Sequence, residues 1–157
     1  MIRRLWTEYI LPVFRRPNRY QVAALCWRIE DDVLQMLLLT SRQTRRWVLP
    51  KGWPMAGFGA LDTAREEAWE EGGVRLEQEG LHLGRYSYSK RMRGVPVRTD
   101  VDVFAVRVIS VSDSFPEAAE RERRWVTPSE AAEMVDEHDL AALLRDAARL
   151  IAPSHDH

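Results

Sequence analysis

One segment constrains the fold more than any other: in residues 52–74 (GWPMAGFGALDTAREEAWEEGGV) a loop rich in glycine and proline passes into a strongly acidic helix. Small apolar residues recur at helical spacing through its second half, which predicts a helix with one buried face. Gly72 and Gly73 then end the pattern, because glycine readily adopts the left-handed conformation found just past a helix end. We therefore predict a helix at about residues 61–72 that packs against a core.

The segments on either side of this helix have the patterns of strands. Runs of β-branched, aromatic and aliphatic residues are bounded by turn residues such as Asp31 and Asp32. The pattern is typical of one mixed domain, α/β of the α+β type, in which helices pack on a sheet. We predict strands at residues 19–28, 33–40, 47–49, 95–110 and 125–126, one or two more within 74–89, and helices that begin at Thr127 and span 139–151.

Length and composition fit a folded protein of one domain. The chain has 157 residues, and its 45% hydrophobic and 30% charged content exclude a disordered or fibrous class. A lone cysteine, Cys26, excludes an internal disulfide and a multi-cysteine metal site. We expect an N-terminal arm at residues 1–18, the folded domain at 19–152 and a flexible tail at 153–157.

The charge balance gives no reason to expect nucleic acid or an anionic membrane as the partner, because 23 basic residues face 24 acidic ones and leave a net charge of −1. Apolar runs stay well short of the ~20 residues that a membrane-spanning helix needs. The N-terminal residues also lack the architecture of a signal peptide. We expect a cytoplasmic protein with no membrane partner.

The acidic helix carries a pattern that points to metal chemistry. Glu67, Glu70 and Glu71 stand at i, i+3 and i+4, which places three carboxylates on one helix face. Like charges at this spacing repel each other, and an isolated helix of this kind is most often a solvated acidic surface. Here a tight glycine loop precedes the helix and basic segments flank it, so the carboxylate oxygens indicate a site for a hard cation such as Mg²⁺ or Mn²⁺.

The same stretch resembles the signature box of the Nudix hydrolase family. That box runs glycine, five residues, Glu, seven residues, Arg-Glu, an aliphatic residue, any residue, Glu-Glu, any residue, glycine and an aliphatic residue. Aligned on the paired glutamates, the opening glycine is Gly52 and the first metal-binding glutamate is Glu67. Two positions depart from the pattern, because Phe58 replaces the early glutamate and Glu66 replaces the arginine. Arg65 is one residue away, about 100° around the helix, and cannot take the arginine's place.

Segments outside the box are similar to the diphosphoinositol polyphosphate phosphohydrolase branch of that family. They are AALCWR, LLLTSRQTRRWVLPKGWP and the later WV, PSEAAEMV and DLAALL patterns, and the likeness covers about residues 19–150. The resemblance implies a Nudix-like α/β/α sandwich with a mixed β-sheet, in which the helix at about 61–72 is the catalytic helix.

The resemblance also implies a catalytic centre. Mg²⁺ or Mn²⁺ would be held by Glu67, Glu70, Glu71 and the backbone carbonyl of Gly52, and would neutralise the substrate diphosphate and polarise the phosphorus attacked by water. The same three glutamates would be the catalytic residues, with Glu70 or Glu71 as the general base. Three glutamates of a later loop are alternatives for the base: Glu117, Glu120 and Glu122.

A polyanionic substrate needs cations that the acidic helix does not offer. Basic residues precede the box, and residues 85–98 carry five basic side chains and no acidic one, which suggests an anion-binding rim. Trp53, directly after Gly52, either lines the pocket or packs beneath the loop. Lys51 is one of the basic residues before the box, and we expect it to bind substrate. The resemblance implies that the other substrate-binding residues are Arg19, Ser41, Arg42 and Lys90.

The expected function is that of a metal-dependent pyrophosphohydrolase. Its substrate, and its only expected partner, would be a highly phosphorylated small molecule of the diphosphoinositol polyphosphate or dinucleoside polyphosphate class; the sequence leaves the oligomeric state open. Removal of pyrophosphate from RNA 5′ ends is a weaker alternative, because the basic surface lacks the interleaved aromatic residues that stack unpaired bases. A Nudix fold that binds a phosphorylated ligand without turnover is the other alternative, kept open by Phe58 and Glu66.

Overall fold

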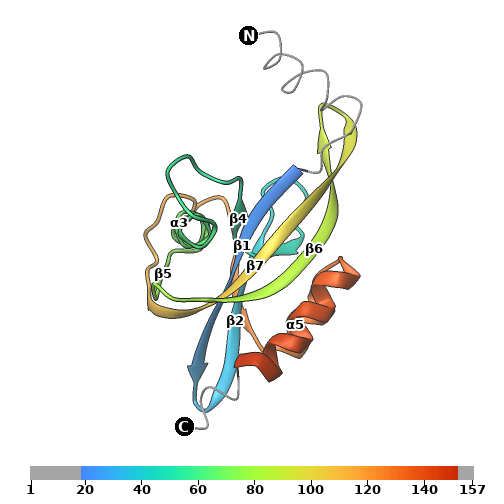
Figure 1. Cartoon of the computed structure of the whole chain (residues 1–157). Helices are drawn as coiled ribbons and strands as arrows, with labels where there is room; N and C mark the ends of the chain where they lie inside the picture. Colours follow the sequence, from blue (N-terminus) through green and yellow to red (C-terminus); the bar gives the residue numbers. More distant parts are fainter. Residues whose placement is uncertain (1–18, 152–157) are drawn as a thin grey trace.

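A computed structural model describes residues 19–151, which form a mixed β-sheet with helices on both faces (Figure 1). The strands are β1 (Arg19–Glu30), β2 (Val33–Thr40), β3 (Trp47–Val48), β4 (Lys51–Gly52), β5 (Val74–Leu76), β6 (Leu81–Met92), β7 (Val95–Val111) and β8 (Arg123–Val126). The helices are α3 (Ala60–Gly72), α4 (Pro128–Met134) and α5 (His138–Ile151).

The strand order explains why the sheet is mixed. It runs β3-β2-β1-β7-β5, with β4 paired to β1, β6 to β7 and β8 to β2. Strands β1 and β7 are parallel, whereas every other pair in the described residues is antiparallel. Strand β4 was not predicted, because two residues close to Pro50 and Pro54 carry no periodic signal. It nevertheless sets Gly52 opposite Val22 of the central strand.

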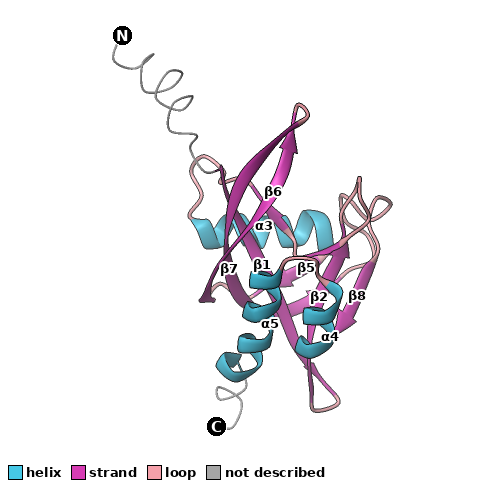
Figure 2. Ribbon diagram, turned by 90° about the vertical axis from the view of Figure 1, so that its right-hand side faces the viewer, coloured by secondary structure: helices cyan, strands magenta, loops and turns pink. Residues whose placement is uncertain are grey.

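Helix α3 covers one face of the sheet and helices α4 and α5 cover the other (Figures 1 and 2). Successive side chains of a strand point to opposite faces. In β1, Ala23 and Leu25 therefore pack in the core on the α5 side, while Val22 and Ala24 pack on the α3 side. The central strand is buried on both faces, which accounts for its nearly continuous apolar sequence and confirms the predicted α/β/α sandwich.

The element boundaries follow local signals in the sequence. Asp31 and Asp32 both have positive φ, 51° and 64°, and form the tight turn between β1 and β2. Gly73 has a φ of 67° and ends α3 in the left-handed conformation. Thr127 caps α4: its side chain accepts from the amide of Glu130, whose side chain binds back to the cap. These signals confirm the predicted helix starts and ends to within about one residue.

The loop at residues 112–122 is folded onto the C-terminal end of α3. The amide of Ser112 donates to the carbonyl of Gly73 at 2.8 Å, and the amide of Glu117 donates to the carbonyl of Glu70 at 2.9 Å. The last carbonyls of a helix have no intrahelical donor. The loop supplies donors there, and so its position is fixed relative to the acidic face of α3.

Some sequence predictions concern parts of the chain that are not described. The expected arm at residues 1–18 and the tail at 153–157 lie outside the described residues. Within residues 19–151, no helix has the length and apolar character required to cross a membrane. Cys26 is fully buried, and burial raises the pKa of its thiol, so it is a core residue rather than a nucleophile.

Candidate functional site

The site is built around the close approach of α3 to strand β4. Gly52 is buried in β4, and a Cβ atom at this position would overlap the carboxyl group of Glu67. The missing side chain therefore allows the Glu67 carboxyl group to lie against the backbone of the glycine loop. This contact brings together Gly52 and Glu67, the first two predicted metal-binding residues in chain order, which lie in different elements.

Glu71 is held more tightly than any other acidic residue of the helix face. Its side chain is only 5% exposed, and both carboxylate oxygens have partners. The backbone amide of Lys51 donates to Oε2 at 3.1 Å. The guanidinium Nη2 of Arg121 lies 3.0 Å from Oε1. The orientation of this carboxylate is thus set by one strand and one loop.

The carboxylates crowd one another. Burial, a hydrogen bond with Glu71 and the charges of Glu71, Glu70 and Glu117 raise the pKa of Glu67 to about 8. Burial also raises the pKa of Glu71, although Arg121 and Lys51 oppose that shift. Like charges held this close disfavour ionisation unless a cation lies between them. The donors are hard oxygen atoms of the kind that Mg²⁺ and Mn²⁺ prefer, so these residues fit a divalent metal ion.

The charge of Glu70 acts on Glu67 of this pair, but the three glutamates are not arranged as a formed metal site. Within residues 19–151, no three carboxylate, imidazole or thiol groups are already gathered around one point as a metal site requires. The charge of Glu70 nevertheless contributes to the raised pKa of Glu67, and its backbone is bound to the amide of Glu117. Binding of an ion by all three glutamates therefore requires their carboxylates to move closer together.

Of the three loop glutamates, Glu117 is the one brought to the helix carboxylates. Its carboxylate lies 3.0 Å from Nε of Arg121, and its charge acts on Glu67. Glu120 and Glu122 are exposed and lie 3.9 Å from the guanidinium groups of Arg42 and Arg45, respectively. The geometry therefore favours Glu117 over the other two as a base supplied by the loop.

Arg121 is a site residue that the sequence pattern did not reveal, because Glu71 lies far from it in the chain. It stands four residues after Glu117, and that ion-pair spacing was the one local signal available. Its side chain is 8% exposed, and it contacts Glu71, Glu117 and the carbonyl of Thr40. It is therefore a structural link between the loop, the helix and β2.

Two of the predicted substrate-binding cations lie close together beside the carboxylates. The Lys51 ammonium is 5.2 Å from the ring centre of Tyr88, and the Lys90 ammonium is 5.5 Å from the ring centre of Trp53. Burial lowers the pKa of Lys51 to about 8, against the opposing effect of Glu71. Trp53 is 38% exposed, which favours a place at the site over packing beneath the loop.

The other three predicted substrate-binding residues differ in position. Arg42 is exposed and lies 3.9 Å from Glu117, at the edge of the carboxylate cluster. The hydroxyl of Ser41 shares a 2.6 Å hydrogen bond with Thr44, so it shapes the loop after β2. Arg19 is the exposed first residue of β1 and shares a strand face with Gln21, whose side chain accepts from Tyr88.

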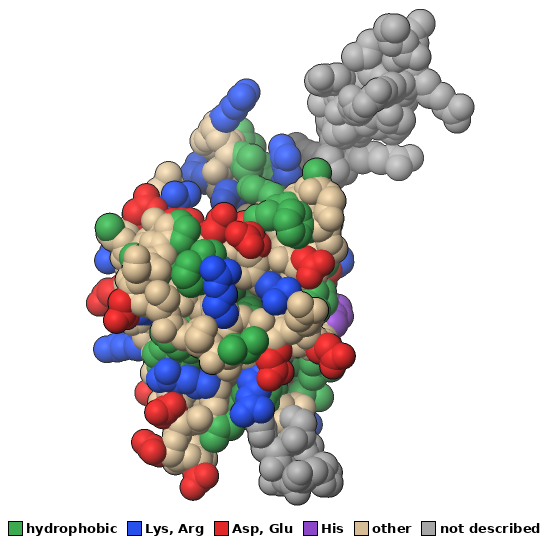
Figure 3. Space-filling view, turned by 90° about the vertical axis from the view of Figure 1, so that its left-hand side faces the viewer, with side chains coloured by type: hydrophobic (Ala, Val, Ile, Leu, Met, Phe, Trp, Pro, Cys, Tyr) green, Lys and Arg blue, Asp and Glu red, His purple; other side chains and the backbone are tan. Residues whose placement is uncertain are grey.

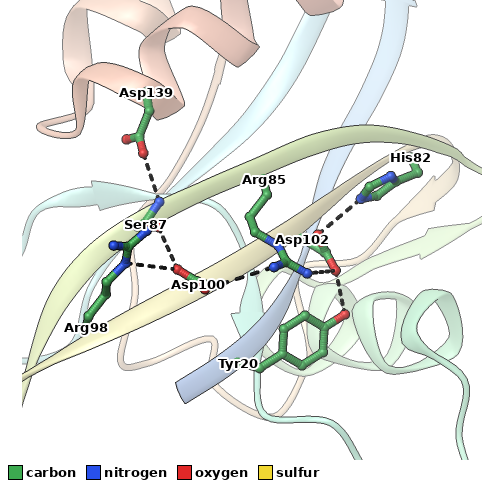
Figure 4. Close-up of polar contacts among 8 residues, drawn as sticks. All are labelled: Tyr20, His82, Arg85, Ser87, Arg98, Asp100, Asp102 and Asp139. Atoms are coloured by element: carbon green, nitrogen blue, oxygen red, sulfur yellow. Dashed lines mark hydrogen bonds and ion pairs between the residues drawn. The ribbon is translucent and has the colours of Figure 1, made fainter. Parts of the chain in front are cut away.

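Two of the five basic side chains of the expected anion-binding rim at residues 85–98 are paired with aspartates. Arg85 binds Asp102 through Nε at 3.1 Å and Nη2 at 3.2 Å, and Arg98 lies 3.3 Å from Asp100 (Figure 4). The cause is the antiparallel register of β6 and β7, which sets Arg85 directly opposite Asp102. On the face that carries α3, basic and acidic side chains are correspondingly intermixed (Figure 3).

Asp102 should make the fold sensitive to acid. Burial raises its pKa, but hydrogen bonds from Arg85, Tyr20 and His82 outweigh burial and lower the pKa to about 2. The unfolded value is about 3.9. The carboxylate therefore contributes stability above about pH 4 that is lost as pH falls toward 2. We expect Asp102→Asn to lower the urea-unfolding free energy at pH 6 and the difference from wild type to shrink toward pH 2.5; a constant difference would contradict this.

The two departures from the box pattern lie together in space. Phe58 and Glu66 line the same small surface hollow beside β5. Arg65, next to the missing arginine, donates to the carbonyl of Leu76 at 3.1 Å and so is directed toward β5. This confirms that Arg65 does not replace the arginine. The hollow lies on a different side of α3 from the buried carboxyl of Glu71.

Comparison with known proteins gives a consistent family match. A family model described as NUDIX domain matches residues 19–147. Nudix hydrolase 4 of Arabidopsis thaliana is 32% identical over 106 residues, which is 68% of this chain and 50% of the relative. Nudix hydrolase 12, mitochondrial, from the same plant is 32% identical over 107 residues, which is 64% of this chain and 52% of the relative. The chain thus spans about half the length of these relatives.

Solved structures share the fold at low sequence identity. A NUDIX hydrolase from Nitrosomonas europaea aligns with a TM-score of 0.66 at 17% identity, covering 85% of this chain and 90% of the other. The C. elegans Ap4A hydrolase aligns with a TM-score of 0.59 at 15% identity, covering 86% and 99%. The NUDIX domain of Shewanella oneidensis NrtR, crystallised with ADP ribose, aligns with a TM-score of 0.65 at 15% identity, covering 94% and 98%.

Proposed function

Because this chain belongs to the Nudix family, we propose that it is a divalent-metal-dependent pyrophosphohydrolase that cleaves a phosphoanhydride bond. The observation that carries the proposal is the crowding of the Glu67 carboxyl group against Gly52 and Glu71, with cationic side chains beside them. A binding surface for phosphate alone has no use for carboxylates in this position. A cation held between them would relieve their repulsion and attract the phosphates.

We assign metal binding to the glutamates of α3 and to the glycine of β4. Glu67, Glu70, Glu71 and the carbonyl of Gly52 would hold Mg²⁺ or Mn²⁺. When bound, the metal would neutralise the diphosphate and polarise the attacked phosphorus. Positioning and electrostatic stabilisation supply most of the rate in phosphoryl transfer.

The cations and the base complete the proposed site. Lys51, Lys90 and Arg42 would bind the phosphate oxygens and orient them toward the helix, as their places around the carboxylates suggest. The proton of the attacking water would pass to Glu70 or to Glu117, both close enough to act electrostatically on Glu67. Arg19 and Ser41 would bind more distant phosphates of the substrate, a role that rests on the sequence resemblance.

We propose a highly phosphorylated small molecule as the substrate, of the dinucleoside polyphosphate or diphosphoinositol polyphosphate class. Two structural neighbours are described as an Ap4A hydrolase and as a domain complexed with ADP ribose, which supports a phosphorylated small-molecule ligand. The exposed ring of Trp53 beside Lys90 offers an aromatic surface next to a cation. The cytoplasmic location stays a prediction from the sequence.

The test is a panel assay of phosphate and nucleotide release with and without Mg²⁺ or Mn²⁺. The panel contains a diphosphoinositol polyphosphate, a diadenosine polyphosphate, ADP-ribose, a nucleoside triphosphate and a 5′-triphosphate RNA. We expect metal-dependent cleavage of one of the first two compounds. Cleavage of the RNA alone would favour the RNA 5′-end function, and binding without cleavage would favour a non-catalytic module.

Arg42 provides a prediction about substrate affinity. We expect Arg42→Ala to raise KM more than it lowers kcat for polyphosphorylated substrates, because the side chain is 58% exposed and lies at the edge of the site. Steady-state kinetics at several substrate concentrations measures the two parameters separately. Arg45→Gln is the matched control, since Arg45 lies in the same loop and pairs with Glu122 away from the carboxylates. An unchanged KM for Arg42→Ala would remove Arg42 from the site.

A further inference from the structure

We propose that Arg121 is a positioning residue that fixes the Glu71 carboxylate for metal binding, in place of the arginine missing at position 66. The box position before Glu67, an arginine in the family pattern, is Glu66 in this chain. The inference rests on the proposed function, because it concerns how the metal ligands are held. It assigns that task to a loop residue more than fifty positions along the chain.

The guanidinium of Arg121 contacts three acceptors from three elements, one through each of its nitrogens. Nη2 lies 3.0 Å from Glu71, Nε donates to Glu117 at 3.0 Å, and Nη1 donates to the carbonyl of Thr40 at 3.1 Å. The side chain is 8% exposed. A planar guanidinium presents its donors in a rigid fork, so three simultaneous contacts fix its plane. The Glu71 oxygen bound to it is fixed in turn.

Glu71 is the metal-binding residue whose carboxylate orientation is set by these contacts. The amide of Lys51 already holds Oε2, and Arg121 holds Oε1, so the two contacts together define the plane of the carboxylate. Partners that hydrogen-bond a metal ligand from behind set its orientation, and their loss typically lowers metal affinity. The same guanidinium holds Glu117, which places a further carboxylate beside the site.

The residues nearest the box arginine position are engaged elsewhere. Arg65 donates to the carbonyl of Leu76, and Glu66 lines the hollow with Phe58. Arg123, the first residue of β8 directly after the loop, binds the carbonyls of Gly72 and Ser112. Among the described residues, Arg121 is the arginine in contact with a predicted metal-binding glutamate.

A positioning role and a simple charge effect have opposite consequences for metal binding. A positive charge close to a cation site repels the cation, so removal of the Arg121 charge alone would tighten metal binding. Removal of the contacts that orient Glu71 would weaken it. Arg121→Lys separates the two effects, because lysine keeps the charge but cannot make the three directed contacts of the guanidinium.

The experiment measures Mn²⁺ binding without substrate, by electron paramagnetic resonance or calorimetry, for wild type, Arg121→Lys and Arg121→Ala. We expect both variants to bind Mn²⁺ about 10- to 100-fold more weakly than wild type. Arg123→Lys is the matched control, since it alters an anchor of the same loop that does not touch the glutamates. Its affinity should stay close to wild type, and circular dichroism verifies that each variant is folded.

The outcomes separate this inference from the proposed function. Failure of wild type to bind Mn²⁺ would overturn the metal-dependent function and this inference with it. Binding by wild type with an equal affinity for Arg121→Lys would overturn the role of Arg121 alone. A loss in Arg123→Lys as large as that in Arg121→Lys would show that general loop integrity, rather than the contact with Glu71, supports the site.

Discussion

Replacing Glu70 with glutamine should lower kcat by about 10²- to 10⁴-fold, the range for loss of a catalytic acid or base, while the protein stays folded. Glutamine keeps the shape of the side chain but removes the negative charge that binds a metal ion or accepts a proton. Glu70 is half-buried, and its backbone carbonyl rather than its side chain accepts from the amide of Glu117, so the substitution leaves that hydrogen bond in place. The measurement is steady-state kinetics on the compound cleaved by wild type, with thermal unfolding alongside.

Glu66→Gln is the control for Glu70→Gln. Glu66 lies on the same helix and loses the same charge, but it lines the hollow shared with Phe58. Its activity should stay close to that of wild type. Wild-type activity in Glu70→Gln would show that the alignment of the box, or the assignment of the metal ligands, is wrong.

The second large effect is expected from Gly52→Ala. A Cβ atom at this position overlaps the Glu67 carboxyl, so the helix carboxylate must move away from β4 or change its side-chain conformation. A displacement of about 1 Å at a catalytic group can cost about 10²-fold in rate. We expect a loss of activity of this order together with weaker Mn²⁺ binding, measured by the same assays.

A second glycine of the same loop provides the comparison for Gly52→Ala. Gly59 has a φ of −72°, and a Cβ there would lie 3.9 Å from its nearest neighbour, on Asp62. Gly59→Ala should therefore be tolerated without loss of activity. If Gly52→Ala were equally active, close contact between Gly52 and Glu67 would not be needed for function.

Most of the fold was predictable because its elements carry strong local signals. The central strand is apolar on both faces, the turn at Asp31–Asp32 is marked by two adjacent acidic residues, and α3 ends at paired glycines. Strand β4 escaped prediction because it owes its existence to pairing with Val22 and Ala23, which is a long-range contact. The residues next to β4 in the sequence do not indicate which distant strand it pairs with.

The site was predictable only in part, for the same physical reason. The spacing of Glu67, Glu70 and Glu71 on one helix face is a local property and could be read from the chain. The pairing of Arg85 with Asp102 depends on strand register, and the contact of Arg121 with Glu71 depends on how the loop returns to the helix. Charge counted over residues 85–98 overestimated the net positive charge of the rim, because the compensating Asp100 and Asp102 lie in β7 just beyond the counted segment.

The loop at residues 112–122 also determines where this chain can change in length. Its amides are matched in register to carbonyls at the end of α3, so one inserted residue would separate Glu117 from Glu70 and shift Arg121 away from Glu71. The turn between β6 and β7 is exposed at Arg93 and Gly94, and the hydrogen bond from Arg91 to the Gly94 carbonyl stays within the hairpin. Exposed turns of this kind are where insertions are usually accommodated. We expect length variation, natural or engineered, to be tolerated in the hairpin turn and selected against in the loop.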